Sequence, residues 1–216
     1  MGRRTPKAVI VDYGMGNLYS VERAVHFVGG RGEITSEPRS IATADRVILP
    51  GVGAFGIGME NLRKRHLDEA IQDYVQREKP LWGICLGMQV LATEGHEFGL
   101  CKGLNLIEGT VVKLQDPSPG GPYFKIPHIG WNTLRTQGSQ EQDHFLSALG
   151  SNPFLYFVHS FIMLPKDFSY VLATTRFGKD EFCSVLAKDT IYGCQFHPER
   201  SGEVGLAMYK QFLFHM

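Results

Sequence analysis

Leu81-Trp82-Gly83-Ile84-Cys85-Leu86-Gly87-Met88-Gln89 is a short apolar run that ends in Gly-x-Cys-x-Gly and then becomes amphipathic. This pattern is typical of a nucleophile elbow, a sharp turn from a strand into a helix that exposes one side chain at the end of a buried sheet. Gly83 and Gly87 lie two positions either side of Cys85, where a Cβ would crowd the turn. A cysteine thiolate is a strong nucleophile and needs only a nearby imidazole to form. The stretch therefore predicts an enzyme whose nucleophile is Cys85.

A candidate base lies near the C-terminus, in Tyr192-Gly193-Cys194-Gln195-Phe196-His197-Pro198-Glu199. The proline favours an extended conformation at His197, and residues i and i+2 of an extended chain share a face. A carboxylate at Glu199 can accept Nδ1–H of the imidazole and leave Nε2 free to take the thiol proton. A lone histidine is more often a satisfied core side chain, but the following Pro-Glu and the separate elbow favour the base. We expect a Cys85–His197–Glu199 triad.

The order of apolar segments predicts the fold. Buried strands are expected at 8–11, 46–49 and 81–84, with amphipathic helices at 18–28, 56–78 and from the elbow to about 93. This alternation indicates an α/β fold with a mostly parallel central sheet, flanked by helices on both faces. Short strands at 111–114, 131–134, 154–159, 170–174 and 182–187 predict an added antiparallel region. A loop at 116–122, a polar connection at 137–143, a short helix near 144–149 and a final helix at 202–214 complete a single domain spanning 1–216.

The composition narrows the class of protein. The chain has 216 residues, with Lys+Arg and Asp+Glu at 22 each, so a formal net charge of zero argues against a nucleic-acid surface. A hydrophobic fraction of 43% is ordinary for a soluble domain, and no signal peptide or membrane-spanning run is present. Four cysteines without paired or zinc-like spacing indicate reduced cytoplasmic thiols. We expect a cytoplasmic protein that binds no nucleic acid, membrane, metal or cofactor.

Other glycine and histidine signals are weaker. Pro50-Gly51-Val52-Gly53 follows a strand and can supply half of an oxyanion hole from the Val52 amide, with the Leu86 amide as the other half, or it is only a tight turn. Gly14-Met15-Gly16 lacks the third glycine of a dinucleotide fingerprint. His128 and His159 lie beside turn or strand signals and are candidates for lining the cleft.

Taken together, three of these motifs resemble those of the class I (triad-type) glutamine amidotransferases: 50–53, 83–89 and 196–199. Three further stretches are similar to the glutaminase subunit of imidazole glycerol phosphate synthase: 12–17 (Asp-Tyr-Gly-Met-Gly-Asn), 127–132 (Pro-His-Ile-Gly-Trp-Asn) and 157–161 (Phe-Val-His-Ser-Phe). The resemblance extends from residue 8 to about 213.

The resemblance implies hydrolysis of L-glutamine to glutamate and ammonia through a thioester on Cys85. His197 is then the base and later the acid, Glu199 orients it, and the Val52 and Leu86 amides form the oxyanion hole. The implied glutamine-binding residues are Gly51, Gly53, Gln89, Glu97, Ser160 and Phe161.

The resemblance also implies a partner. Ammonia passes to a separate cyclase or synthase barrel, in a heterodimer, and Tyr13, Asn17 and Trp131 fall in motifs that face that barrel. Two alternatives stay open: a paralogue that supplies ammonia to a sugar-modifying synthase of surface-polysaccharide assembly, and a γ-glutamyl cysteine hydrolase. A pseudo-glutaminase scaffold is disfavoured because Cys85, His197 and Glu199 are all present.

Overall fold

The computed structural model describes residues 5–115, 125–136, 145–147, 149–150 and 153–216. The predicted loop at 116–122 and the connection at 137–143 lie outside these ranges. The predicted helix at 144–149 is described only in part, and residues 145–147 form a turn rather than a helix.

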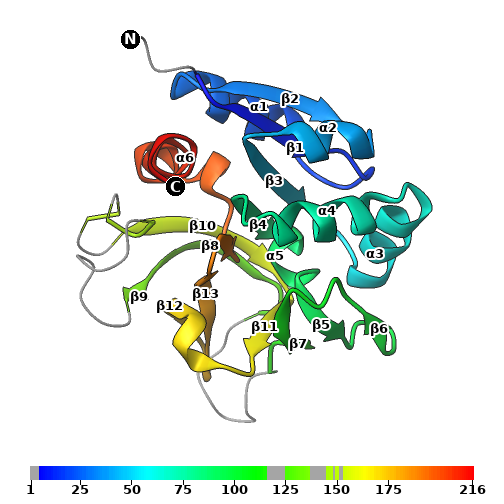
Figure 1. Ribbon diagram of the computed structural model, residues 1–216. Coiled ribbons are helices and arrows are strands. Elements are labelled where there is room, and N and C mark those ends of the chain that lie inside the picture. The colour runs from blue at the N-terminus through cyan, green and yellow to red at the C-terminus, as the bar shows by residue number, and fades with distance from the viewer. Residues whose placement is uncertain (1–4, 116–124, 137–144, 148, 151–152) are drawn as a thin grey trace.

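Within the described residues, the central sheet has eight strands in the order β2-β1-β3-β4-β14-β13-β12-β9 (Figure 1). The parallel half comprises β1 (Lys7–Val11), β2 (Arg31–Thr35), β3 (Arg46–Gly51), β4 (Leu81–Cys85) and β14 (Ile191–Cys194). The sheet continues antiparallel through β13 (Asp180–Lys188), β12 (Val171–Phe177) and β9 (Arg135–Thr136). The predicted parallel sheet with an antiparallel extension is confirmed.

Helices cover both faces of the parallel half, as predicted. Alternating side chains of β1 point to opposite faces: Ala8 and Ile10 belong to one buried cluster, Val9 and Val11 to the other. The first cluster includes side chains of α1 (Leu18–Phe27) and α6 (Gly202–His215). The second includes side chains of α2 (Pro38–Thr43), α3 (Phe55–Lys64) and α4 (Leu67–Gln76). Strands buried on both faces account for the continuous apolar runs in the sequence.

The predicted helix over 56–78 is wrong as a single element. It is two helices, because α3 ends at Lys64 and α4 begins at Leu67. Between them His66 adopts a left-handed conformation with φ 55°, and its N–H bonds to the carbonyl of Arg63. The apolar stripe steps five residues from Leu62 to Leu67, which departs from helical spacing and is the signal of the break.

The predicted elbow helix to about residue 93 is also wrong. The helix α5 covers only Leu86–Gln89, and the chain then enters the strand β5 (Ala92–Gly95). This strand pairs with β7 (Ile107–Lys113) and β6 (Cys101–Lys102). The amide of Leu104 bonds to the carbonyl of Val90, so long-range backbone pairing replaces the helical bonds.

Two smaller sheets complete the region around the end of β4. One has the order β11-β7-β5-β6, with β11 spanning Phe161–Pro165, and the other pairs β8 (His128–Thr133) with β10 (Phe154–His159). The sequence did not predict β2, β5, β6, β9, β11, β14 or α2, because each is short or lacks a periodic apolar pattern. The paired strands β8 and β10 cross the molecule beside β4 and α5 (Figure 1).

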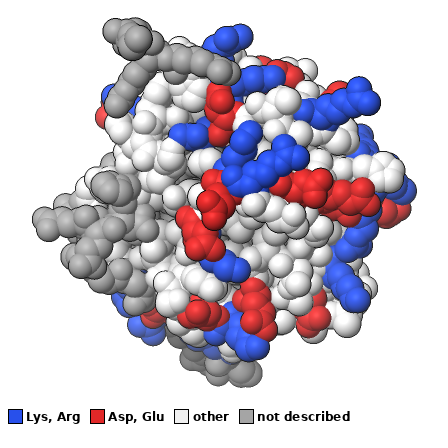
Figure 2. Space-filling model, viewed as in Figure 1, with Lys and Arg blue, Asp and Glu red and all other residues white. Residues whose placement is uncertain are grey.

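The surface carries both signs of charge. On the face shown in Figure 2, basic and acidic side chains intermingle, in keeping with equal numbers of each in the sequence. Among the described residues, no helix is long and apolar enough to cross a membrane.

Candidate active site

The turn at Cys85 has the geometry of a nucleophile elbow. Cys85 is the last residue of β4 and precedes α5, with φ 54° and ψ −110°, a conformation that L-residues rarely adopt. A Cβ at Gly87 would overlap the carbonyl oxygen of Leu49, and one at Gly83 would lie 2.6 Å from the carbonyl oxygen of Gly87. The prediction that both flanking positions must be glycine is therefore confirmed on steric grounds.

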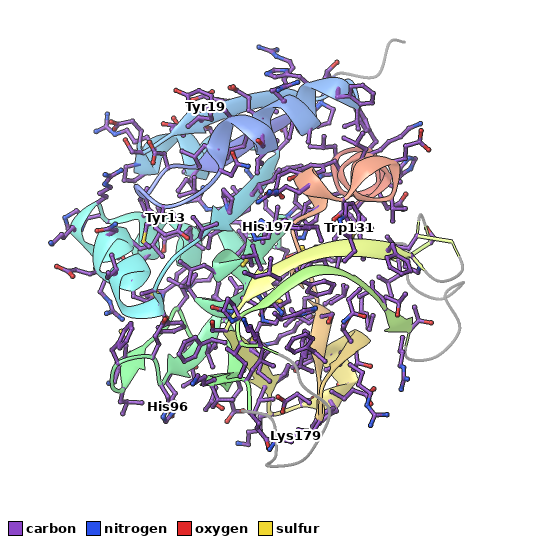
Figure 3. All side chains as sticks on the ribbon, turned by 180° about the vertical axis from the view of Figure 1, so that it is seen from behind. Tyr13, Tyr19, His96, Trp131, Lys179 and His197 are labelled. Atoms are coloured by element: carbon purple, nitrogen blue, oxygen red, sulfur yellow. The ribbon has the colours of Figure 1, made fainter. Side chains whose placement is uncertain are left out.

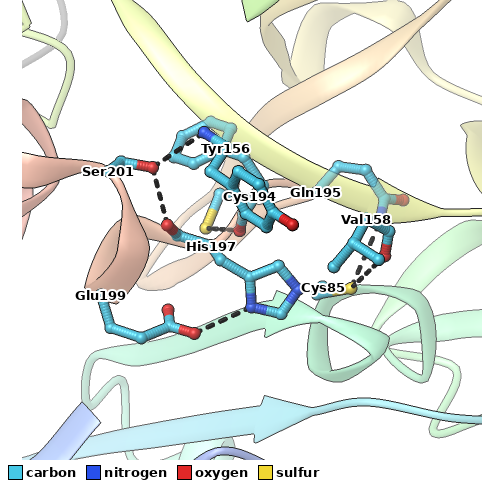
Figure 4. A network of polar contacts seen from close by, with 9 residues as sticks. Cys85, Tyr156, Val158, Cys194, Gln195, His197, Glu199 and Ser201 are labelled. Carbon is cyan, nitrogen blue, oxygen red and sulfur yellow. Dashed lines mark hydrogen bonds and ion pairs between the residues drawn. The ribbon is translucent and has the colours of Figure 1, made fainter. Parts of the chain in front are cut away.

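His197 reaches Cys85 because its strand lies next to β4. Cys194 of β14 pairs with Ile84 in parallel register, and after a bend at residues 195–196 the chain reaches His197, whose backbone is extended. The His197 amide bonds to the carbonyl of Tyr156 at 2.8 Å, which fixes the backbone there. In Figure 4 the imidazole lies between Cys85 and Glu199. The sheet thus brings together Cys85, His197 and Glu199, which the sequence predicted as a triad but could not place in space.

The two sides of the imidazole have different environments. Its Nδ1 lies 2.9 Å from Oε1 of Glu199, while Nε2 is buried without a hydrogen-bond partner on the side that faces Cys85. Burial lowers the pKa of His197, but negative charge on Cys85 and Glu199 outweighs it and raises the pKa from 6.5 to about 10. The site therefore favours the charged, imidazolium form of His197.

A cavity of about 460 Å³ opens in front of Cys85. It is large enough for a small polar substrate. Seven of the predicted oxyanion-hole and substrate-binding residues line it: Val52, Gly53, Leu86, Gln89, Glu97, Ser160 and Phe161. Four further lining residues are Ala54, Pro127, Val158 and His159, of which the sequence singled out only His159.

Two polar side chains in the cavity wall are held by backbone groups. Gln89 donates from Nε2 to the carbonyl of Phe161 at 2.8 Å. The carboxylate of Glu97 accepts a hydrogen bond from the amide of Phe55, the first residue of α3, at 2.8 Å. These hydrogen bonds hold Gln89 and Glu97 in the cavity wall. That the two side chains contact the substrate stays a prediction. The oxyanion roles of the Val52 and Leu86 amides stay predictions as well.

Gly51 does not line the cavity, contrary to the prediction. It pairs with Cys85 between β3 and β4, and a Cβ there would lie 2.9 Å from Cβ of Leu86 and would overlap the hydroxyl of Tyr13. Its lack of a side chain instead allows the elbow and Tyr13 to pack closely behind the nucleophile.

The predicted partner-facing residues differ in exposure. Trp131 is 53% exposed and Asn17 is exposed, but Tyr13 is fully buried, so the prediction of Tyr13 as a surface contact is wrong. Its hydroxyl has no hydrogen-bond partner, and burial, with a smaller effect of Cys85, raises its pKa well above 10. In the view of Figure 3, His197 lies between Tyr13 and Trp131.

Sequence reasoning missed Gln195. Its side chain is fully buried and places Nε2 3.7 Å from Sγ of Cys85. The available signal was a lone amide between the apolar residues Cys194 and Phe196. Among the residues that the structure describes, no cluster of three or more His, Cys, Asp or Glu could hold a metal ion.

The chain is similar in sequence to proteins of a known family. The family profile described as "Glutamine amidotransferase class-I" matches residues 9–216. The imidazole glycerol phosphate synthase subunit HisH 1 of Legionella pneumophila (strain Paris) is 44% identical over 206 residues, covering 94% of this chain and 97% of that protein. The corresponding HisH protein of Geobacter sulfurreducens is 41% identical over 207 residues, covering 95% and 97%.

Solved structures share the fold at lower identity. The structure of PurLQS from Thermotoga maritima matches with a TM-score of 0.72 and 21% identity, covering 97% of this chain and 98% of that one. A crystal structure described as a glutamine amidotransferase matches with a TM-score of 0.69 and 18% identity, covering 95% and 97%. At these identities the match establishes the shared architecture alone.

Proposed function

This chain belongs to the class I glutamine amidotransferase family, and on that premise we propose that Cys85, His197 and Glu199 hydrolyse L-glutamine to glutamate and ammonia. The ammonia serves the formation of imidazole glycerol phosphate in histidine biosynthesis, as the names of the relatives indicate. The strongest structural support is the placement of Cys85 beside His197. A cysteine in the strained conformation of an elbow faces an imidazole whose far nitrogen is already bound to a carboxylate.

The first half of the reaction releases ammonia. The Cys85 thiolate attacks the side-chain amide carbon of glutamine, and the Val52 and Leu86 amides stabilise the oxyanion. The C–N bond then breaks as Nε2–H of His197 protonates the leaving amine, which departs as ammonia and leaves a thioester. Glu199 stabilises the imidazolium and holds its Nδ1–H throughout.

The second half regenerates the enzyme. Nε2 of His197 takes a proton from water, which attacks the thioester carbon. The C–S bond breaks, glutamate leaves, and the sulfur returns as a thiolate beside the imidazolium. Each proton that Nε2 gives in the first half is regained in the second, so the site needs no other acid or base.

A partner follows from the chemistry of the product. Ammonia released to water becomes ammonium, which is not a nucleophile, so a direct route to an acceptor site is needed. We expect a cyclase-type synthase barrel to bind the surface that includes Asn17 and Trp131. Trp131 and Ile129 of β8 are 53% and 61% exposed, and aromatic and aliphatic side chains of this kind are suited to protein contact.

The test is glutamate release from glutamine, measured with and without the cyclase barrel and its phosphoribosyl-imidazolecarboxamide substrate. We expect low activity of the chain alone, strong stimulation by the loaded barrel, and none with Cys85→Ala. Hydrolysis that depends on Cys85 but ignores this barrel would redirect the assignment to another synthase, the sugar-modifying kind first. Cleavage of γ-glutamyl peptides in preference to glutamine would reject the amidotransferase assignment.

A further inference from the structure

Gln195 is a buried amide in contact with the sulfur that would react. Its side chain has no solvent exposure, and its Nε2 lies 3.7 Å from Sγ of Cys85. Its Oε1 accepts a hydrogen bond from Nε2 of Gln89 at 3.1 Å. Whether a donor or an acceptor faces the sulfur depends on which way this amide is turned, so the orientation decides its chemical effect.

The carbonyl of Phe161 fixes that orientation, because a carbonyl oxygen can only accept. Gln89 must therefore direct its NH₂ group at Phe161, where the distance is 2.8 Å. The second hydrogen of the same NH₂ group points at Gln195 and requires an oxygen there. With Oε1 of Gln195 committed to Gln89, its NH₂ group must face Cys85. The reverse orientation would oppose two NH₂ groups and place an oxygen against the sulfur.

A second set of contacts leads to the same carbonyl from the other side. Asn132 is oriented by backbone groups, since its Oδ1 accepts from the amide of Thr133 at 2.8 Å and its Nδ2 donates to the carbonyl of Arg176 at 3.1 Å. Its Nδ2 also lies 3.3 Å from Nε2 of His128. This nitrogen of His128 must therefore be an acceptor, and the proton of the neutral ring is on Nδ1.

The tautomers of the two histidines then follow in turn. Nδ1–H of His128 donates to Nε2 of His159 at 3.0 Å, which places the proton of His159 on Nδ1. That Nδ1–H donates to the carbonyl of Phe161 at 3.0 Å. The backbone partners of Asn132 at one end and the carbonyl of Phe161 at the other end therefore require the same donor and acceptor roles for His128 and His159. The carbonyl that orients Gln89 and Gln195 is held in place by this buried histidine pair.

We propose that Gln195 is a further catalytic residue, whose Nε2–H group donates a hydrogen bond to the Cys85 thiolate and stabilises the charged nucleophile. This inference rests on the glutaminase function proposed above, since it deepens the account of the same site. Hydrogen bonds to charged groups are stronger than those to neutral groups, so a donor at this position favours the thiolate over the thiol.

The surroundings of the sulfur show why such a donor is needed. The carbonyl of Val158 lies 3.9 Å from Sγ, where it accepts from the thiol and repels the thiolate. His197, Tyr13 and Cys194 are described groups that interact electrostatically with Cys85, and of these three only His197 can carry a positive charge. Gln195 adds a neutral donor that favours the thiolate whatever the charge on His197.

Alkylation of Cys85 by iodoacetamide tests the inference without glutamine or a partner. The background variant Cys101→Ser removes the cysteine that is only partly buried, and the rate is followed against pH. In that background, Gln195→Met keeps the length of the side chain but removes the donor. We expect alkylation near neutral pH to slow about tenfold and the midpoint of the profile to rise by about one pH unit. Gln195→Glu keeps an acceptor for Gln89 but puts negative charge beside the sulfur, so the midpoint should rise further.

The matched control is Gln72→Met, because Gln72 also donates through Nε2 to a backbone carbonyl, that of Leu104, but lies away from the site. It should leave the profile unchanged. Urea unfolding shows which variants fold, and the NH₂ resonances of Gln195 in the unsubstituted chain carry the test if Gln195→Met does not fold. In the unsubstituted chain, the NH₂ resonances of Gln195 should shift with the same midpoint as alkylation.

An unchanged midpoint in a folded Gln195 variant, or NH₂ resonances that ignore the titration, would overturn the inference. The two proposals can fail separately. A shifted midpoint without glutamine hydrolysis in the presence of the loaded barrel would uphold the role of Gln195 at the sulfur and reject the glutaminase. Glutamine hydrolysis together with unchanged alkylation in the Gln195 variants would uphold the glutaminase and reject the role of Gln195 at the sulfur.

Discussion

Acidification will destabilise this protein through the buried pair His128 and His159. Their rings are 3.0 Å apart at the facing nitrogens, and their other partners are the amide of Asn132 and the carbonyl of Phe161. None of these partners carries a negative charge. Burial lowers the pKa of His128 to about 4, and burial together with the neighbouring His128 lowers that of His159 to about 3.

The sign and size of the effect follow from these values. Both folded pKa values lie below the unfolded value of 6.5, so the unfolded chain takes up the extra protons as the pH falls. The contribution of His128 and His159 to stability is fully present above pH 6.5 and declines as the pH falls towards their folded pKa values. When the pH falls from about 7.5 to about 5, each histidine lowers the free energy of unfolding by about 2 kcal/mol, and the pair lowers it by about 4 kcal/mol.

Comparison of the parent protein with the variant His128→Phe isolates the contribution of the histidine pair to the loss of stability. The ring of His128 stacks on Phe157 and Phe177, with centroids 4.8 and 4.1 Å away, so phenylalanine keeps the packing. Urea unfolding of both proteins at the two pH values gives each loss of stability. The contributions of His197 and of the carboxylates are common to both proteins and cancel in the difference. We expect the variant to lose about 2 kcal/mol less than the parent. Equal losses would refute the conclusion that the pair is neutral and resists protonation in the folded state.

Three further predictions concern the elbow and the triad. Gly87→Ala should destabilise the protein by at least about 3 kcal/mol more than Gly56→Ala in urea unfolding, because a Cβ at Gly87 would overlap the carbonyl oxygen of Leu49 whereas one at Gly56 meets nothing within 4 Å; similar losses would show that the elbow can relax. Cys85→Gly should be about 1 kcal/mol more stable than Cys85→Ala, since glycine accepts φ 54° without strain, and the reverse order would show that the turn is not strained. Glu199→Gln should lower Cys85-dependent glutamate release by about 10²-fold or more in the partner complex, because His197 loses the carboxylate 2.9 Å from Nδ1; near-normal turnover would remove Glu199 from the triad.

The local chemistry of the elbow could be predicted from sequence. Gly83 and Gly87 flank Cys85 because backbone lies where their side chains would be, and the Gly-x-Cys-x-Gly spacing makes that constraint visible in the sequence. The apolar runs of β1, β3 and β4 likewise indicated strands buried on both faces. Helices with a regular stripe, such as α1 and α6, were found within a few residues of their ends.

Elements that depend on distant pairing were not predictable. The strand β5 has little local signal and exists because β7 and β6 bond to it, which is why the elbow helix is shorter than its sequence suggests. The burial of Tyr13 depends on close packing at Gly51 of β3, beside Leu86 of α5, and both lie far from Tyr13 in the sequence. Side-chain type alone could not tell a buried tyrosine from an exposed one.

The sequence by itself determined the reactive groups: a cysteine between two obligatory glycines, and a histidine with a glutamate two residues later. Only the tertiary structure decided which side chains meet. The parallel pairing of β14 with β4 brings His197 beside Cys85, and the same pairing carries Gln195 to the sulfur. The steric limit at Gly83 comes from Gly87, four residues away, and the spacing of the motif records it. The limit at Gly87 comes from Leu49 of β3, and the orientation of the buried amides and imidazoles depends on partners from β8, β10, β11 and α5, so only the packed fold assembles these contacts.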